Sequence, residues 1–215
     1  MILYRLNEGL AYQEKILYRP RTCFLMTQLG DPVPPEVDSI REKLKSALEE
    51  HDVALIDADS EVTGGDFLFK IWQMIVAVPL AVAVVHEEMP TTTQCNVFYE
   101  VGLAHALGKE SIVIKTPKAR IPSDFVRTEY IKYDPNFEQR MKKYLDNFFK
   151  QGEWYELVAE QVERNPLLAI DYLRRAFLIS GDTRIKAEVA NIRGDFVPPR
   201  KSEKQRRDPF GRVLN

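Results

Sequence analysis

The chain has 215 residues, which is enough for one domain of about 150 residues with an extension. Its 45% hydrophobic and 29% charged residues are ordinary for a globular protein. A net charge of −2 excludes a general attraction to nucleic acid, and two cysteines exclude a disulfide framework. The longest apolar stretch, 71–85, is interrupted by Gln73 and Pro79, so it is too broken to span a membrane. We therefore expect a cytoplasmic protein with no membrane partner.

Short apolar runs that end in turn residues predict five strands, at 22–27, 53–56, 80–85, 111–115 and 129–133. Apolar residues at helical spacing predict helices between these strands, at 35–51, 67–78, 95–109 and 136–149. Asp66 is expected to cap the second helix after a Gly64-Gly65 loop, and Cys95 or Asn96 is expected to open the third. Strands that alternate with helices predict an α/β fold with a doubly wound parallel sheet, covered on both faces.

We divide the chain into four parts: a lead-in segment at 1–21, an α/β domain at 22–150, a helical extension at 151–197 and a basic tail at 198–215. Helical spacing in the extension predicts helices at 154–162, 166–180 and 183–192. One helix hairpin cannot bury its own apolar face, so the extension should pack on the domain or on another subunit. The tail has few apolar residues and many basic ones, which predicts disorder. We expect no nucleic-acid partner, although the tail has the charge that would suit one.

The sequence contains none of the common motifs for binding a cofactor or a metal. The three histidines, His51, His86 and His105, lack the spacing of metal ligands, and no zinc-type cysteine pair occurs. No Gly-x-Gly-x-x-Gly or Walker sequence occurs either. We therefore expect no metal and no bound cofactor.

The most informative stretch is Asn96-Val-Phe-Tyr-Glu100-Val-Gly-Leu-Ala-His-Ala-Leu-Gly-Lys109. It places one carboxylate in the expected first turn of a helix whose small residues let it lie close to the sheet. Together with 23–30 and Asp57-Ala58-Asp59, it resembles the TIR-like and nucleoside 2-deoxyribosyltransferase-like family, most closely predicted nucleotide-binding TIR-like proteins. The resemblance covers roughly 22–133. It implies a flavodoxin-like sheet and chemistry at an N-glycosidic bond.

The resemblance also implies roles for particular residues. Glu100 matches the glutamate that attacks the sugar in the transferases and assists loss of nicotinamide from NAD in enzymatic TIR domains. The remaining implied substrate-binding residues are Thr27, Gln28, Gly30, Asp57, Asp59 and Asn96. Relatives often carry an aspartate directly after the third strand, where this chain has His86-Glu87-Glu88. That departure leaves open which residue contacts the ribose or base.

One carboxylate suffices for the chemistry. Cleavage of a glycosidic bond builds positive charge on the sugar, which an ionised carboxylate stabilises or traps. The dipole of a helix N-terminus would keep Glu100 ionised near pH 7. Nicotinamide leaves NAD as a neutral molecule and needs no strong acid, and the sequence offers no obvious acid. These arguments favour NAD as the substrate. The resemblance implies an N-glycosidic hydrolase in antiviral defence or signalling, which assembles as a homo-oligomer or binds an activator through the helical extension.

Other interpretations stay open. Glu100 could be a helix-capping residue, Asp57 and Asp59 could end a strand, and Gly30 could serve turn geometry. The chain could be a nucleotide-binding sensor without catalysis, which the altered loop at 86–88 favours. It could also be a nucleoside 2-deoxyribosyltransferase, or an adaptor that acts through its extension and tail.

Overall fold

The computed structural model describes residues 16–30, 32–60, 67–122 and 130–195. The predictions for most of the lead-in segment, the Gly64-Gly65 loop, the Asp66 cap and the basic tail lie outside these ranges. Within them, no helix is both long and apolar enough to cross a lipid bilayer.

Five parallel strands form one sheet, in the order β2-β1-β3-β4-β5. They are β1 (Thr22–Met26), β2 (Ala54–Asp57), β3 (Leu80–Val85), β4 (Glu110–Lys115) and β5 (Tyr130–Lys132). A single 3-10 turn, η1 (Ala58–Ser60), follows β2. This is the flavodoxin-like strand order, so the predicted fold class is confirmed.

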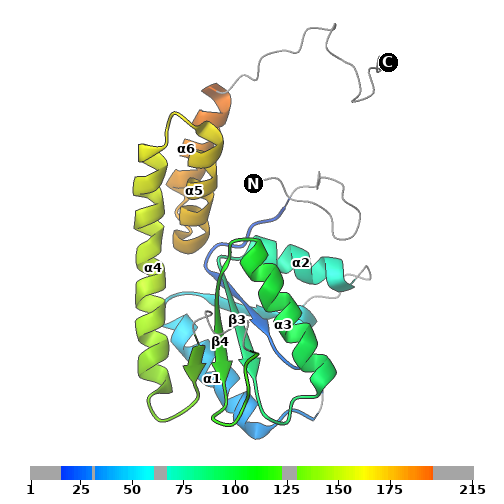
Figure 1. Cartoon of the computed structure of the whole chain (residues 1–215). Coiled ribbons are helices and arrows are strands. Elements are labelled where there is room, and N and C mark those ends of the chain that lie inside the picture. Colours follow the sequence, from blue (N-terminus) through cyan, green and yellow to red (C-terminus); the bar gives the residue numbers. More distant parts are fainter. Residues whose placement is uncertain (1–15, 31, 61–66, 123–129, 196–215) are drawn as a thin grey trace, which may run out of the picture.

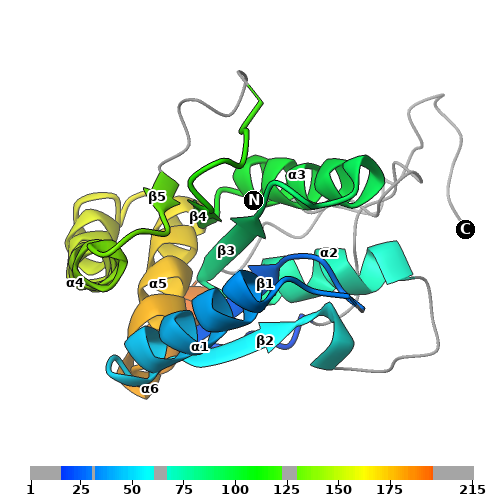
Figure 2. The same cartoon turned by 90° about the horizontal axis from the view of Figure 1, so that it is seen from below.

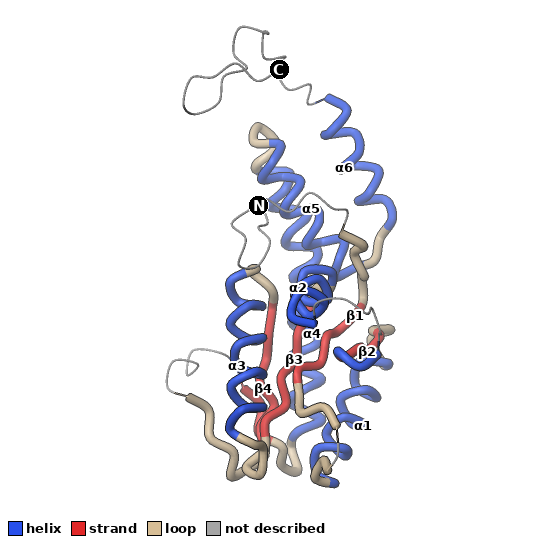
Figure 3. The backbone as a smooth tube through the Cα atoms, turned by 90° about the vertical axis from the view of Figure 1, so that its right-hand side faces the viewer, coloured by secondary structure: helices blue, strands red, loops and turns tan. Residues whose placement is uncertain are grey.

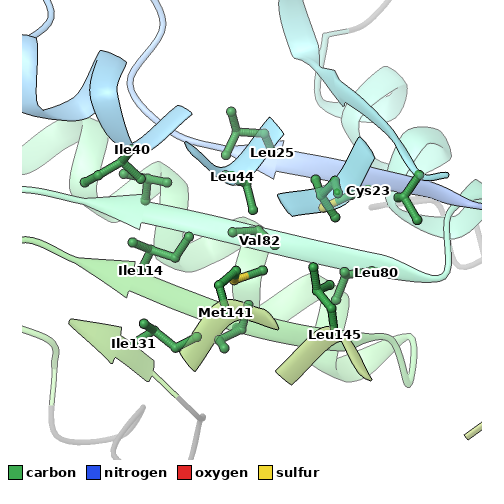
Figure 4. Close-up of a cluster of buried hydrophobic side chains, with 14 of the residues drawn as sticks. Cys23, Leu25, Ile40, Leu44, Leu80, Val82, Ile114, Ile131, Met141 and Leu145 are labelled. Atoms are coloured by element: carbon green, nitrogen blue, oxygen red, sulfur yellow. The ribbon is translucent and has the colours of Figure 1, made fainter. Parts of the chain in front are cut away.

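Helices cover both faces of the sheet. On one face lie α1 (Pro35–Glu49) and α4 (Phe137–Gln161), and on the other lie α2 (Phe67–Ala77) and α3 (Thr91–Ala106) (Figures 1 and 2). All six residues of β3 are fully buried, because this central strand has a helical layer above and below it. Figure 4 shows the α1–α4 side of the core, where Leu80 and Val82 of β3 point toward Leu44 and Met141.

The helical extension begins inside a long helix rather than after one. The structure joins the predicted helices at 136–149 and 154–162 into α4, so the predicted boundary after residue 150 falls within an unbroken helix. A Cβ on Gly152 would lie 3.3 Å from Cγ2 of Ile179. Glycine at this point therefore lets α4 approach its neighbour closely instead of ending the helix.

Two further helices, α5 (Pro166–Ser180) and α6 (Thr183–Asp195), pack beside the far half of α4 (Figures 1 and 3). Asn165 caps α5 through its side chain, and Gly181 ends it with a φ of 74°. Ile179 of α5 reaches the core beneath the sheet, and the Arg21 amide donates to Leu178 O at 2.9 Å. The extension thus packs on the α/β part, as one of the two expected arrangements requires.

The helix that carries Glu100 begins earlier than the sequence predicted. α3 begins at Thr91, directly after Pro90, and the Met89 amide donates to His86 O in the short loop before it. The residues predicted as the end of a polar loop are therefore its first turn. Proline just before a helix suits the N-terminus, because its φ of −55° is already close to helical.

Candidate functional site

The sheet has a topological switch point between β1 and β3. The chain moves from β1 to β2 on one side, and from β3 through β4 to β5 on the other. Open α/β sheets bind ligands in the crevice at the carboxyl ends of the strands that flank such a point. Here these ends carry Thr27 and Gln28 after β1 and His86 after β3, which we call the switch-point cluster.

Hydrogen bonds fix the orientation of this cluster. Nε2 of Gln28 donates to Pro32 O at 3.0 Å, and Oε1 of Gln28 lies 3.1 Å from Nε2 of His86. Because a carbonyl oxygen only accepts, Nε2 of His86 carries the proton and Nδ1 presents a lone pair. Neither Nδ1 of His86 nor Oγ1 of Thr27 has a hydrogen-bond partner in the described part of the chain.

Burial controls the charge of His86. The side chain is 4% exposed, and this desolvation lowers its pKa against the opposing pull of Glu87, Glu88 and Glu36. The imidazole is therefore neutral near pH 7. Glu87 accepts a hydrogen bond from Oγ1 of Thr116, which lowers the pKa of Glu87 and keeps it ionised. The cluster combines neutral polar groups with a rim of negative charge.

Glu100 lies elsewhere than the sequence predicted. It is the ninth residue after Thr91, about 13 Å along α3 from the helix start, not in its first turn. The helix dipole is weak at that depth, so it does not hold the carboxylate ionised. Instead, burial raises the pKa of Glu100 to about 7, the reverse of the expected direction. Among the described residues, none forms a hydrogen bond or ion pair with it.

The other predicted site residues lie in varied surroundings. Oδ2 of Asp57 pairs with Nη2 of Arg41 at 2.8 Å, and Oδ1 of Asp57 accepts from the Asp59 amide at 3.2 Å. Gly30 has a φ of 82° and open space around its Cβ position, so its backbone conformation rather than a close contact requires glycine. Asn96 is exposed inside α3 and is not its cap, which corrects that expectation.

The structure therefore brings some predicted residues together and separates others. Thr27 and Gln28 meet at the switch point, and Asn96 lies one turn before Glu100 on the same face of α3. No hydrogen bond or ion pair joins these two groups within the described ranges. Sequence analysis missed His86 as a member of the cluster, although its place directly after β3 was a signal. In the same ranges, no group of three His, Cys, Asp or Glu residues is placed to hold a metal ion.

Comparisons with known proteins give little further identity. No family model matches the chain, and no curated protein matches it. Among solved structures, a CMP N-glycosidase of Clostridium botulinum, BcmB, aligns over 59% of this chain and 98% of its own, with 20% identity and a TM-score of 0.41. The function proposed below is drawn from the residues of this chain.

Proposed function

We propose that this chain hydrolyses the N-glycosidic bond of a nucleotide, with Glu100 as the catalytic carboxylate and NAD as the substrate. The observation that carries the proposal is the environment of Glu100, a partly buried carboxyl group with a pKa raised to about 7 and no described partner. An unpaired, desolvated carboxylate costs folding free energy, and such groups gather at functional sites.

The ionised form of Glu100 suits this reaction. As the glycosidic bond lengthens, the sugar gains positive charge, which a nearby carboxylate stabilises or traps as a covalent intermediate that water then hydrolyses. A carboxylate with few water contacts interacts more strongly with that charge than a hydrated one. We further propose that Asn96, on the same face of α3, contacts the substrate beside Glu100.

Because the pKa of Glu100 is about 7, the pH dependence of cleavage should differ between NAD and nucleotides with other bases. Nicotinamide leaves as a neutral molecule from a cationic ring, so only ionised Glu100 is needed and release should increase with pH through about 7. A base that must be protonated to leave would use the protonated carboxyl as an acid, and cleavage would then decrease over the same range. The direction of the pH profile therefore identifies the leaving group.

The decisive experiment follows nicotinamide release from NAD by the purified full chain. We expect Glu100→Gln to reduce release by at least about 100-fold. Glu110→Gln is the matched control, because it removes the same charge from a partly buried residue at the amino end of β4 and should leave release unchanged. Equal rates for the wild type and Glu100→Gln would sink the proposal.

A second candidate is a nucleotide-binding sensor without catalysis. It is favoured by the depth of Glu100 along α3, since the polar groups at the strand ends belong to the switch-point cluster instead. The sensor would bind a nucleotide and return it chemically intact after long incubation. Recovery of the free base would exclude it.

We also propose that activity depends on assembly through the helical extension, in a defence or signalling role. Trp154 and Leu157 of α4 and Leu167 of α5 are each more than half exposed, at 54%, 56% and 68%. Large apolar side chains exposed close together are typical of protein contacts. Nicotinamide release per molecule should therefore increase with protein concentration, and a monomer with full activity would contradict this proposal.

A further inference from the structure

Two buried polar atoms of the switch-point cluster lack a hydrogen-bond partner. Thr27 is 7% exposed and His86 is 4% exposed, yet Oγ1 of the first and Nδ1 of the second are unpaired in the described part of the chain. A buried polar atom left unpaired costs about 1–3 kcal/mol. Two such atoms beside the crevice of a parallel sheet suggest that a ligand supplies the missing hydrogen bonds.

Thr27 and His86 each come one residue after a strand whose alternate side chains face α1. Cys23 and Leu25 of β1 belong to the core between the sheet and α1, and Thr27 continues that alternation. Val82 and Val84 of β3 belong to the same core, and His86 continues theirs. The charge of Glu36, in the first turn of α1, acts on His86, which agrees with this placement.

The protonation state of His86 selects the kind of group that can pair with it. Gln28 accepts from Nε2, so the neutral ring offers only a lone pair at Nδ1. The partner must therefore donate a hydrogen bond. A ligand hydroxyl that donates its one hydrogen to Nδ1 can still accept from Oγ1 of Thr27, so a single hydroxyl would satisfy both atoms.

The surrounding charge narrows the choice. Among the described residues, the charges that act on His86 are the carboxylates of Glu36, Glu87 and Glu88. α1 also carries Glu36 and Asp38 in its first turn, and no side chain caps its N-terminus. This concentration of negative charge would repel a phosphate group but not a neutral hydroxyl. Of the groups on a nucleotide, the sugar hydroxyls fit.

We infer that Nδ1 of His86 and Oγ1 of Thr27 bind a sugar hydroxyl of the nucleotide, so that the site selects ribose over deoxyribose. This inference rests on the proposed nucleotide substrate. Both atoms are closed off from solvent in the unliganded chain, so the surrounding side chains move apart when the sugar enters. Gln28 is a positioning residue in this inference, because its Oε1 fixes the tautomer of His86.

The test measures binding rather than turnover. The probes are the four ribonucleoside 5′-monophosphates, NAD, and the 2′-deoxy, 3′-deoxy and corresponding fluoro forms of the monophosphates. Binding is measured by calorimetry, and the Nδ1 signal of His86 is followed in the ¹⁵N-labelled full chain. We expect at least one ribonucleotide to shift that signal, and removal of the bound hydroxyl to weaken affinity at least about tenfold. Fluorine matches the hydroxyl in size but cannot donate, so the fluoro form should bind as weakly as the deoxy form.

Two variants sharpen the result. Thr27→Val keeps the side-chain shape and should reduce the preference for ribose. Thr22→Val makes the same change at the other end of β1, where the hydroxyl already donates to Pro20 O at 3.1 Å, and should leave the preference unchanged. Wild-type binding and the His86 signal keep the inference testable even if a variant fails to fold.

The outcomes separate this inference from the proposed function. Equal affinity for ribose and deoxyribose forms, an unmoved Nδ1 signal at saturation, or no binding of any nucleotide overturns the inference. In the first two cases, nicotinamide release that depends on Glu100 would still support the hydrolase, whereas the absence of binding by any nucleotide, NAD included, would contradict both proposals. A shifted His86 signal with NAD recovered intact would instead support the inference and contradict the hydrolase.

Discussion

Threonine stands at both ends of β1, and the two side chains are equally buried at 7% exposure. The hydroxyl of Thr22, at the amino end, donates to Pro20 O, whereas that of Thr27, at the carboxyl end, has no described partner. The same residue on the same strand is thus satisfied at one end of the sheet and unsatisfied at the other. The difference belongs to the two ends of β1, since the buried hydroxyl of Ser111, near the amino end of β4, is also without a partner in the described part of the chain.

Several long basic side chains near the amino end of the sheet are paired, as Thr22 is. Nζ of Lys109 donates to Val76 O at 2.7 Å, and Nη1 of Arg175 donates to Gly108 O at 3.0 Å. Arg174 and Arg175 both pair with Asp171 beside a cavity of about 40 Å³. The carbonyls of Val76 and Gly108 lie at the C-terminal ends of α2 and α3, where cations are favourable. Polar groups here attach α5 to the α/β part.

Breaking the ion pairs at the amino end should therefore have a large effect on stability. Asp171→Asn keeps the volume of the side chain but leaves Arg174 and Arg175 without a carboxylate. We expect a loss of about 3 kcal/mol in the free energy of unfolding, measured by urea denaturation. Asp182→Asn is the control, because its pair with Arg184 is exposed and should be worth less than about 1 kcal/mol. Equal losses for the two variants would contradict the role given to Asp171.

The second effect is the pH dependence of stability, to which the shifted pKa values of two residues contribute with opposite signs. Burial raises the pKa of Glu100 from 4.5 to about 7, so the native state holds more protons than the unfolded one in that range and stability falls as pH increases from 4.5 to 7. Burial and the charges of Arg174 and Arg175 lower the pKa of Lys109 from 10.5 to about 7, so stability increases with pH from 7 to 10.5.

Variants separate the two contributions. Glu100→Gln should remove the decline between pH 4.5 and 7, and Lys109→Met should remove the increase between pH 7 and 10.5. At about 1.4 kcal/mol per pKa unit, the decline should amount to at most about 3 kcal/mol and the increase to at most about 5 kcal/mol, measured by urea unfolding at several pH values. A decline that survives Glu100→Gln would show that another group causes it.

The smallest expected change in stability comes from removing the threonine hydroxyl at each end of β1. Thr22→Val removes a paired hydroxyl and should cost about 1 kcal/mol. Thr27→Val removes an unpaired one and should be neutral or stabilise the unliganded protein by up to about 1 kcal/mol. Thermal unfolding of both variants without nucleotide measures the difference. A loss at Thr27 as large as that at Thr22 would mean that its hydroxyl is already satisfied.

Much of the fold could be predicted because local patterns coincide with tertiary structure. β3 and α5 have the predicted bounds, since an apolar run after Pro79 and a helical pattern after Asn165 are unambiguous. α4 was predicted as two helices because the sequence does not show that Gly152 packs against Ile179. Contacts between distant segments decide such cases.

The candidate site was less predictable for the same reason. The ends of β1 and β2 were placed from sequence to within one residue, but the pKa of Glu100 depends on what surrounds it rather than on its neighbours in the chain. An expected helix start four to five residues too late put Glu100 in a first turn where it does not lie. His86 was missed because its partner, Gln28, is 58 residues away.

The continuity of α4 has a mechanical consequence. Its first half covers the sheet with Met141 and Leu145, and its second half packs Ala159 against α5 and α6, with no loop between them. A helix of 25 residues is about 37 Å long and transmits a tilt or a push along its axis as a rod does. A contact made at the α5–α6 end can therefore shift the half of α4 that packs on the sheet. The sheet and the α5–α6 pair should also unfold in a single cooperative transition.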